Sequence, residues 1–210
     1  MQSIDESAPG KGARTRHAII EAVTHLFNRK GYAASTIRDI CEAGGIQKGG
    51  LYNHFHSKNE IVLESFDWAR QQLGAALDAA MAPVADASAQ QRLIHLAESF
   101  CALYENDTYF PAGCPVLNTG IEAKGEMDIL RAPARDAMAK FRGRIVDIGE
   151  AGIDSGELPA DLDLEHLADI FAALLEGAMF LSVLNDDTRY LHNAVDHLRS
   201  VVLSLNAEED

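Results

Sequence analysis

The chain has 210 residues, of which 47% are hydrophobic and 24% charged, so it can bury a sizeable core and is not a disordered protein. Its three cysteines, Cys41, Cys101 and Cys114, are an odd set without metal-ligand spacing, which excludes a disulfide framework and argues against a zinc site. The net charge of -14 excludes a chain that is basic throughout, but residues 1–58 hold eight Lys and Arg against five Asp and Glu.

The first predicted helix covers residues 15–30, where apolar side chains recur at helical spacing and Gly31 follows as a terminator. A disordered tail is expected before it, over residues 1–12, and an acidic tail over residues 206–210. The N-terminal tail has no apolar core and does not resemble a secretory signal.

Two short helices are predicted next. Thr36 is placed to cap the second helix, with Asp39 completing an approximate capping box and Gly44 with Gly45 ending it. A helix of about seven residues cannot stand alone and must pack on its neighbours. The stretch "IQKGGLYNHF", residues 46–55, predicts the third helix.

A long fourth helix is predicted over residues 58–81. Ser57 is its expected N-cap, Glu60 is expected to complete a capping box, and Pro83 stops it. At a rise of about 1.5 Å per residue, such a helix is roughly 36 Å long and can join two parts of the molecule.

Five further helices complete the expected all-α fold of about nine helices. They are predicted over residues 89–105, 115–122, 128–155, 164–184 and 188–205. No convincing β-alternation or hairpin signal accompanies them.

The last two predicted helices indicate a homodimer. The eighth is apolar on nearly all sides and the ninth carries an apolar stripe, so four such helices are expected to meet between two copies. The longest apolar run, residues 170–184, is shorter than the roughly 20 residues needed to span a bilayer. We therefore expect a soluble, cytoplasmic protein without a membrane partner.

The order of the first three helices is that of a helix-turn-helix unit, whose last helix enters the major groove of DNA. The third helix gathers donors for phosphates and base edges: Gln47, Lys48, Tyr52, Asn53 and His54. Gly49 and Gly50 each cost about 1 kcal/mol in a helix, which indicates a close backbone approach to DNA or to a neighbouring helix. Lys58 begins the next helix, where free N–H groups favour a phosphate.

Two elements carry a family resemblance. The pattern F-x-x-x-G-Y-x-x-[ST]-[ST] covers residues 27–36, and K-G-x-L-Y-x-H-F-x-x-K covers residues 48–58. Residues 15–62 closely resemble the DNA-binding domain of the TetR family of bacterial transcriptional repressors. The resemblance implies a homodimer with a helix-turn-helix DNA-binding domain over residues 13–57 and an effector-binding and dimerisation domain over residues 58–205. It also implies that the matching Thr36, Lys48, Tyr52, His54 and Lys58 lie near the backbone of operator DNA.

The sequence signals for effector-binding residues are weaker than those for DNA-binding residues. Arg70 interrupts the apolar stripe of the fourth predicted helix, and is either an ion-paired or snorkelling arginine or a counter-charge for an anionic ligand. Aromatic residues that either line an apolar pocket or belong to the ordinary core are Phe66, Phe100, Tyr104, Tyr109 and Phe110.

The stretch "GCPVLNTGIE" has its own character. Pro115 suits the first turn of a helix, which places Cys114 at the helix N-terminus, where the dipole lowers the thiol pKa. Asn118 and Glu122 lie on one helical face and either hydrogen-bond a ligand or each other, or form a rigid corner. With Gly113 and Cys114, they match the G-C-[PL]-x-x-N-x-x-x-E signature of a TetR branch that includes regulators responding to electrophiles, aldehydes or acrylate-like acids.

The sequence thus predicts a ligand-responsive repressor that a small effector releases from a palindromic operator. One alternative is an electrophile or redox sensor of the same fold that uses Cys114, and another is a helical adaptor without DNA binding. An enzyme is not expected, because no histidine lies near Cys114 in sequence and no Gly-rich phosphate loop is present. No catalytic residue, cofactor or metal is therefore predicted.

Overall fold

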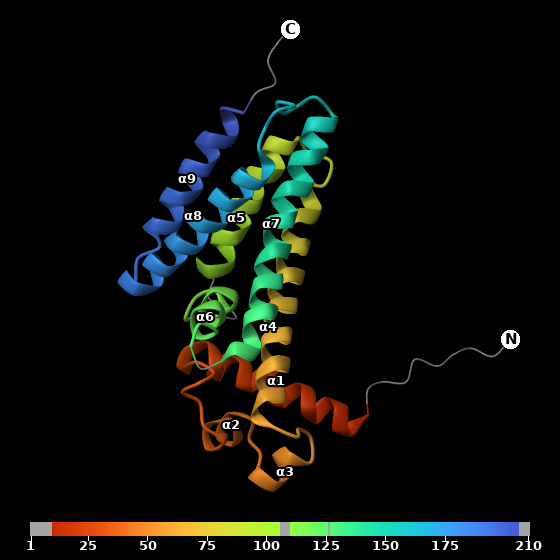
Figure 1. Ribbon diagram of the computed structural model, residues 1–210, viewed down its shortest axis with the longest axis vertical. Coiled ribbons are helices and arrows are strands. Elements are labelled where there is room, and N and C mark those ends of the chain that lie inside the picture. Colours follow the sequence, from red (N-terminus) through yellow and green to blue (C-terminus); the bar gives the residue numbers. More distant parts are fainter. Residues whose placement is uncertain (1–9, 106–109, 126, 206–210) are drawn as a thin grey trace, which may run out of the picture.

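The computed structural model describes residues 10–105, 110–125 and 127–205, and over these residues the fold is all-α (Figure 1). Most of both predicted tails, residues 1–9 and 206–210, and the predicted pocket residue Tyr109 lie outside the described residues. The described helices are α1 (Lys11–Lys30), α2 (Ile37–Ala43), α3 (Lys48–Tyr52), α4 (Lys58–Met81), α5 (Ala89–Glu105), α6 (Pro115–Glu122), α7 (Arg131–Asp154), α8 (Leu164–Asn185) and α9 (Arg189–Leu203), with 3-10 turns at Ala82–Val84 and Asp128–Leu130.

The helix α1 begins earlier than the sequence predicts. It starts at Lys11 instead of Thr15, so residues 11 and 12 are helical and do not belong to a disordered tail. The sequence has no start signal there, because Gly10 makes no side-chain cap and the first turn has no acidic residue. The turn is closed locally instead, since the Thr15 hydroxyl donates to the Lys11 carbonyl at 3.0 Å.

The helix α2 has the predicted bounds, whereas α3 is shorter than the predicted residues 46–55. It ends at Tyr52, because the amides of Asn53 and His54 donate to carbonyls three residues back and tighten the chain into a turn. Phe55 then enters the core with no exposed surface. The segment 46–55 therefore consists of one helical turn followed by a non-helical turn.

The helix α4 starts at the predicted cap, with the Ser57 hydroxyl accepting from the Glu60 amide at 3.1 Å. The predicted capping box is wrong in its second half. The Glu60 carboxylate accepts from the His56 amide at 2.5 Å and pairs with Arg16 at 2.6 Å. Arg16 competes for this carboxylate from α1 and also lies 4.2 Å above the Phe55 ring, so it ties α1, the α3–α4 loop and α4 together.

The helix α4 links the two parts of the molecule (Figure 1). Its start packs with α1, and its later turns pack against α5. The C-terminal part is a bundle in which α7 packs on α8, α8 on α9, and α5 on α9. The short α6 lies where the bundle meets the N-terminal part, near α1 in Figure 1.

The helix α8 is longer than the apolar run in the sequence suggests. Its 22 residues are enough to cross a membrane by length and composition alone, with a mean hydropathy of 1.9 over the most apolar stretch. Half of that stretch is buried inside the structure, as in the core helix of a folded domain.

Two glycines let α7 approach its neighbours closely. A Cβ added at Gly149 would lie 2.3 Å from Leu164 Cδ2, and one at Gly152 would lie 2.5 Å from Ala89 Cβ and 2.7 Å from Leu158 Cδ1. Because Ala89 Cβ is attached directly to the backbone, the second contact cannot be relieved by a side-chain rotation.

We expect Gly152→Ala to lower the free energy of unfolding by about 1 to 3 kcal/mol, since the added methyl forces α7 away from α5. Gly143→Ala on the same helix is the matched control, because a Cβ there has no atom within 4 Å among the described residues. The control should gain up to about 1 kcal/mol from helix propensity. Chemical denaturation of the two variants and the wild type measures this, and equal stabilities would contradict the tight α7 contact.

Candidate functional site

The residues predicted to contact DNA lie at the end of the molecule formed by α2 and α3, at the bottom of Figure 1. Thr36 caps α2, Lys58 begins α4, and the others lie on α3 or beside it. The exposed members are Thr36, Gln47, Lys48, Gly49, Tyr52 and Asn53, while His54 and Lys58 are half-buried. The donors of Gln47, Lys48, Tyr52 and Asn53 are therefore exposed, whereas the Thr36 hydroxyl and the Lys58 ammonium already donate within the chain.

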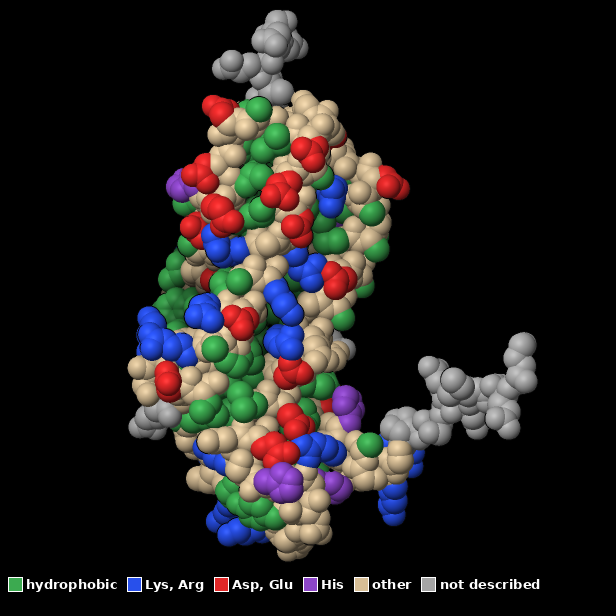
Figure 2. Space-filling model, turned by 45° about the vertical axis from the view of Figure 1, so that its right-hand side comes forward, with side chains coloured by type: hydrophobic (Ala, Val, Ile, Leu, Met, Phe, Trp, Pro, Cys, Tyr) green, Lys and Arg blue, Asp and Glu red, His purple; other side chains and the backbone are tan. Residues whose placement is uncertain are grey.

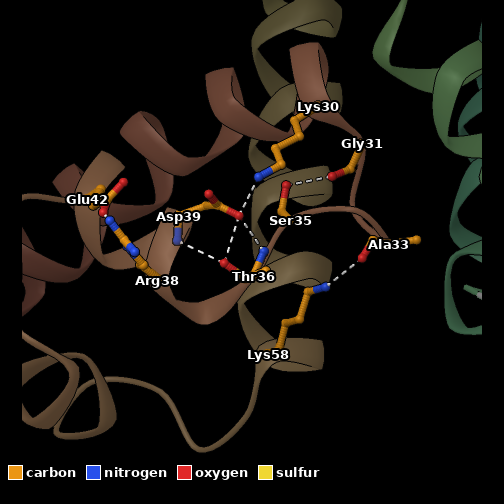
Figure 3. Close-up of polar contacts among 9 residues, drawn as sticks. All are labelled: Lys30, Gly31, Ala33, Ser35, Thr36, Arg38, Asp39, Glu42 and Lys58. Carbon is orange, nitrogen blue, oxygen red and sulfur yellow. Dashed lines mark hydrogen bonds and ion pairs between the residues drawn. The ribbon is translucent and has the colours of Figure 1, made fainter.

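Hydrogen bonds fix the start of α2 (Figure 3). The Thr36 hydroxyl accepts from the Asp39 amide at 3.2 Å, and Asp39 Oδ2 accepts from the Thr36 amide at 2.7 Å, which confirms the predicted capping box. Lys30 Nζ reaches the same carboxylate at 2.5 Å, and Lys58 Nζ donates to the Ala33 carbonyl at 3.3 Å. The Lys30 ammonium and then the Thr36 donors hold the Asp39 pKa well below its usual range.

The two glycines of α3 differ in their surroundings. A Cβ at Gly50 would lie 3.0 Å from Ile46 Cγ1, so this glycine accommodates the chain's own packing. A Cβ at Gly49 would meet no described atom within 4 Å, and the residue is exposed. Gly49 therefore leaves the helix backbone open to an outside partner.

The charge is divided along the molecule as the sequence indicates. In Figure 2, Asp and Glu side chains crowd the upper part, while Lys and Arg side chains lie across the middle of this face and at its lower edge. Among residues 10–58, eight Lys and Arg outnumber three Asp and Glu, so a phosphate backbone is attracted to this part of the chain.

A cavity of about 90 Å³ lies in the C-terminal bundle, between α4, α5, α6, α7 and α8. Its walls are mostly apolar, and charged side chains from α4, α7 and α8 also line it. The lining side chains used below are Arg70, Phe100, Cys114, Lys140, Phe141, Arg144 and Glu176.

The cavity brings together three of the predicted effector residues, Arg70, Phe100 and Cys114. Tyr104 does not line it, but its hydroxyl interacts with the Cys114 thiol behind the wall. Phe66 is buried and lines a neighbouring pocket of about 510 Å³ that shares Arg70 and Lys140 with this cavity, and Phe110 is buried in the core.

Asn118 and Glu122 do not line this cavity, but Asn118 lines a second one of about 160 Å³ between α6 and α8. Asn118 donates to the Ala112 carbonyl at 2.9 Å. The two side chains are four residues apart, but each is bound to backbone of a different segment.

Glu176 is the residue that sequence reasoning missed. It is 7% exposed, and its Oε2 is buried without a hydrogen-bond partner among the described residues. Burial raises the pKa of this carboxyl to about 7, and the Cys114 thiol acts in the opposite direction as a hydrogen-bond donor. The available signal was a single charged residue inside the apolar run of α8.

The environment of Cys114 in the structure does not activate its thiol, in contrast to the prediction. Pro115 does begin α6 and Cys114 is its N-cap, as predicted. However, the thiol is only 1% exposed, and burial followed by the negative charge of Glu176 raises its pKa well above the usual range. Desolvation and a neighbouring carboxylate thus outweigh the helix dipole, which acts only on the ends of a short helix.

The segment 110–122 clasps the corner between α1 and α2. The Glu122 carboxylate accepts from the amides of Tyr32 and Ala33 at 3.1 and 2.9 Å. Gly31 at this corner has φ +85°, and a Cβ there would lie 2.9 Å from Glu122 Oε1, so only glycine admits the contact. The Asn28 side chain donates to the Gly113 carbonyl at 3.0 Å, which adds a second connection.

One group of side chains has ligand types that metals use. Potential ligand atoms of Cys101, Glu105 and His192 lie within 4.8 Å of one another. His192 Nε2 and Glu105 Oε1 are 2.5 Å apart and already form a pair. Burial and then Glu105 raise the pKa of Cys101 to about 12, which disfavours the thiolate that a metal requires.

Comparisons with known proteins agree with this geometry. The family model of bacterial regulatory proteins of the tetR family matches residues 19–65, and that of the tetracyclin repressor-like C-terminal domain matches residues 89–198. The transcriptional repressor DhaR of Mycobacterium sp. (strain GP1) is 29% identical over 178 residues, which cover 80% of this chain and 82% of that protein.

Solved structures share the whole fold. A TetR transcriptional regulator from Chloroflexus aurantiacus superposes with a TM-score of 0.88 at 31% identity, covering 93% of this chain and 98% of the other. The regulator CifR, solved with a 26-bp double-strand operator DNA, has a TM-score of 0.77 at 22% identity, covering 93% and 98% of the two chains.

We expect the buried carboxyl to make stability depend on pH. Because the folded protein holds the Glu176 proton up to about pH 7 and the unfolded chain only up to about 4.5, the free energy of unfolding falls as pH rises through this window. The loss is on the order of 3 kcal/mol per protomer. Glu176→Gln lacks this term, so its stability relative to the wild type should rise up to about pH 7 and then level off.

Chemical denaturation at fixed protein concentration between about pH 5 and about pH 8 measures this difference. Glu150→Gln, at an exposed position on α7, is the control and should run parallel to the wild type. A Glu176→Gln profile parallel to the wild type would show that the carboxyl is not shifted.

Proposed function

Because the chain belongs to the TetR family of bacterial transcriptional regulators, we propose that it is a homodimer that binds a palindromic operator and leaves it when a small effector fills the C-terminal cavity. The family membership makes it a DNA-binding transcriptional repressor with a C-terminal effector domain, and not an enzyme. The adaptor alternative is thereby set aside. Gly113, Cys114, Asn118 and Glu122 support our assignment to the branch with the G-C-P-x-x-N-x-x-x-E motif.

The DNA contacts are proposed at the exposed end of α2 and α3. Gln47, Tyr52 and Asn53 offer hydrogen-bonding groups on α3 and its flanks, and Lys48 a charge, all of them exposed. Thr36 and Lys58, at the starts of α2 and α4, and His54, just after the end of α3, are proposed to meet the phosphate backbone. The open face of Gly49 carries this proposal, because a bare backbone in a helix destabilises the free protein and favours close approach.

The dimer is proposed to form through α8 and α9. Apolar side chains that these helices expose are Ile170, Phe180, Leu181, Val183, Leu184 and Leu203. A second copy covers them in a four-helix arrangement, and places two reading helices about 34 to 36 Å apart on the DNA. We assign this apolar surface to a partner copy and not to lipid, and place the protein in the cytoplasm with its operator.

The coupling between cavity and DNA is proposed to run through α6. Its first residues form part of the cavity wall, where the Cys114 amide donates to Met179 Sδ at 3.3 Å. Its last residue, Glu122, holds the α1–α2 corner. A ligand that shifts α6 therefore changes the position of α1 to α3. A coupling free energy of about 1 to 3 kcal/mol between ligand binding and DNA binding is enough for induction.

A thiol-based sensor is the less supported version of this function. Electrophiles and oxidants attack the thiolate, and the Cys114 thiol is buried with a raised pKa. The cavity favours a ligand that binds without forming a bond to sulfur.

We expect Gly49→Ala to weaken binding to an operator selected from genomic fragments by about tenfold or more, because the methyl group separates the backbone from DNA. The same change should leave folding intact or stabilise it by up to about 1 kcal/mol. Gly143→Ala, far from the reading head on α7, is the control and should bind as the wild type does. Unchanged affinity of Gly49→Ala in a fluorescence anisotropy titration would refute the close approach.

We expect Glu122→Ala to release the amides of Tyr32 and Ala33, so their hydrogen exchange should accelerate by about tenfold or more. Operator affinity should shift by about fivefold or more if the clasp sets the orientation of the head. Glu150→Ala removes an exposed carboxylate that pairs with no residue in the described part of the chain, and should change neither quantity. Faster exchange with unaltered operator affinity would show that the clasp does not reach the DNA-binding surface.

A further inference from the structure

The unpaired carboxyl of Glu176 gives the cavity a polar end. Glu176 comes from α8, is more than nine-tenths buried, and lines the cavity. Its Oε2 has no hydrogen-bond partner within the described residues. Above about pH 7, where this carboxyl is ionised, a buried acceptor without a partner destabilises the empty cavity, so a ligand that donates a hydrogen bond here offsets that cost.

The groups facing Glu176 do not satisfy it. The Cys114 thiol interacts with it from the N-cap of α6 and is a weak donor. The Tyr104 hydroxyl, from α5, lies beside the same thiol, but its geometry forms no hydrogen bond with any of the described residues. One oxygen of the carboxyl therefore remains available to whatever occupies the cavity.

Positive charge lines the more exposed part of the cavity. Arg70 pairs with Asp67 and Arg144 pairs with Asp78, so both guanidinium groups are already engaged. Lys140 is exposed and forms no ion pair with any residue that the structure describes. The ammonium of Lys140 is thus free to meet an anionic group at the mouth.

The space between these ends is short and apolar. The rings of Phe100 and Phe141 lie 5.6 Å apart at its wall. The volume of about 90 Å³ is smaller than the roughly 150 Å³ cavity that admits benzene in another protein. The chain of a ligand here has only a few carbon atoms.

On the premise that this cavity is the effector site, we propose that the effector is a short aliphatic carboxylate with a hydroxyl or protonated amine at its other end. Its carboxylate meets Lys140 at the mouth, and its donor binds Oε2 of Glu176 at the buried end. A simple fatty acid of the same length leaves Glu176 unpaired and is rejected, since a site built to receive a donor discriminates strongly against an analogue without it.

The test is calorimetric titration of the full-length protein, without DNA, at about pH 8 so that Glu176 is ionised, with three probes: 4-hydroxybutyrate, 4-aminobutyrate and butyrate. At least one of the two donor-bearing acids should bind about tenfold tighter than butyrate. Glu176→Met keeps the site filled with a side chain of similar length, and should remove this preference without loss of thermal stability. Lys140→Ala should weaken all three acids, and Glu150→Ala should weaken none.

A preference for donor-bearing acids that persists in Glu176→Met would overturn the proposal. Equal binding of the three acids to the wild type, or no binding of either donor-bearing acid, would do the same. The regulatory function is tested separately with the operator complex. Donor-bearing acids that bind without releasing the operator would leave the ligand class standing and refute induction, whereas release by molecules without a donor would refute the ligand class alone.

Discussion

A single carboxylate from the C-terminal part, that of Glu122, accepts hydrogen bonds from two backbone amides of the N-terminal helix-turn-helix part. Gly31 ends α1 with a positive φ, so the amides of the next two residues, Tyr32 and Ala33, lie outside the helix and need other hydrogen-bond acceptors. Glu122 accepts both, and charge-assisted bonds of this kind are stronger than neutral ones. This contact connects the N-terminal helices to the cavity, because α6 carries Glu122 at one end and part of the cavity wall at the other.

The elements that the sequence predicted well are those with local signals. Thr36 with Asp39, Ser57, and Pro115 mark helix starts through bonds or dihedral angles within a few residues, and α2, α4 and α6 have the expected first residues. The helices α1 and α3 deviate because their ends have no such signal. Gly10 provides no cap, and a tightened turn follows Tyr52 without any residue that marks it.

The candidate site was less predictable, because its chemistry arises from contacts between distant residues. Glu122 meets Tyr32 across 90 residues of chain, and no local pattern identifies that partner. Cys114 was placed correctly at a helix start, but the burial that raises its pKa comes from the surrounding helices. Glu176 is present in the sequence only as one charged residue within the apolar run 170–184, and its unpaired oxygen becomes visible only when α8 is packed.

At the position of Glu176 on α8, the stability of the fold and the binding of a ligand favour different side chains. An apolar side chain of similar volume stabilises such a site, whereas the carboxyl retains a cost that only a ligand offsets. Selection for heat resistance alone would therefore replace Glu176 early, with the fold and the reading head intact. On the proposal that Glu176 binds the effector, a repressor stabilised in this way would still bind its operator but would no longer select effectors that carry a hydrogen-bond donor.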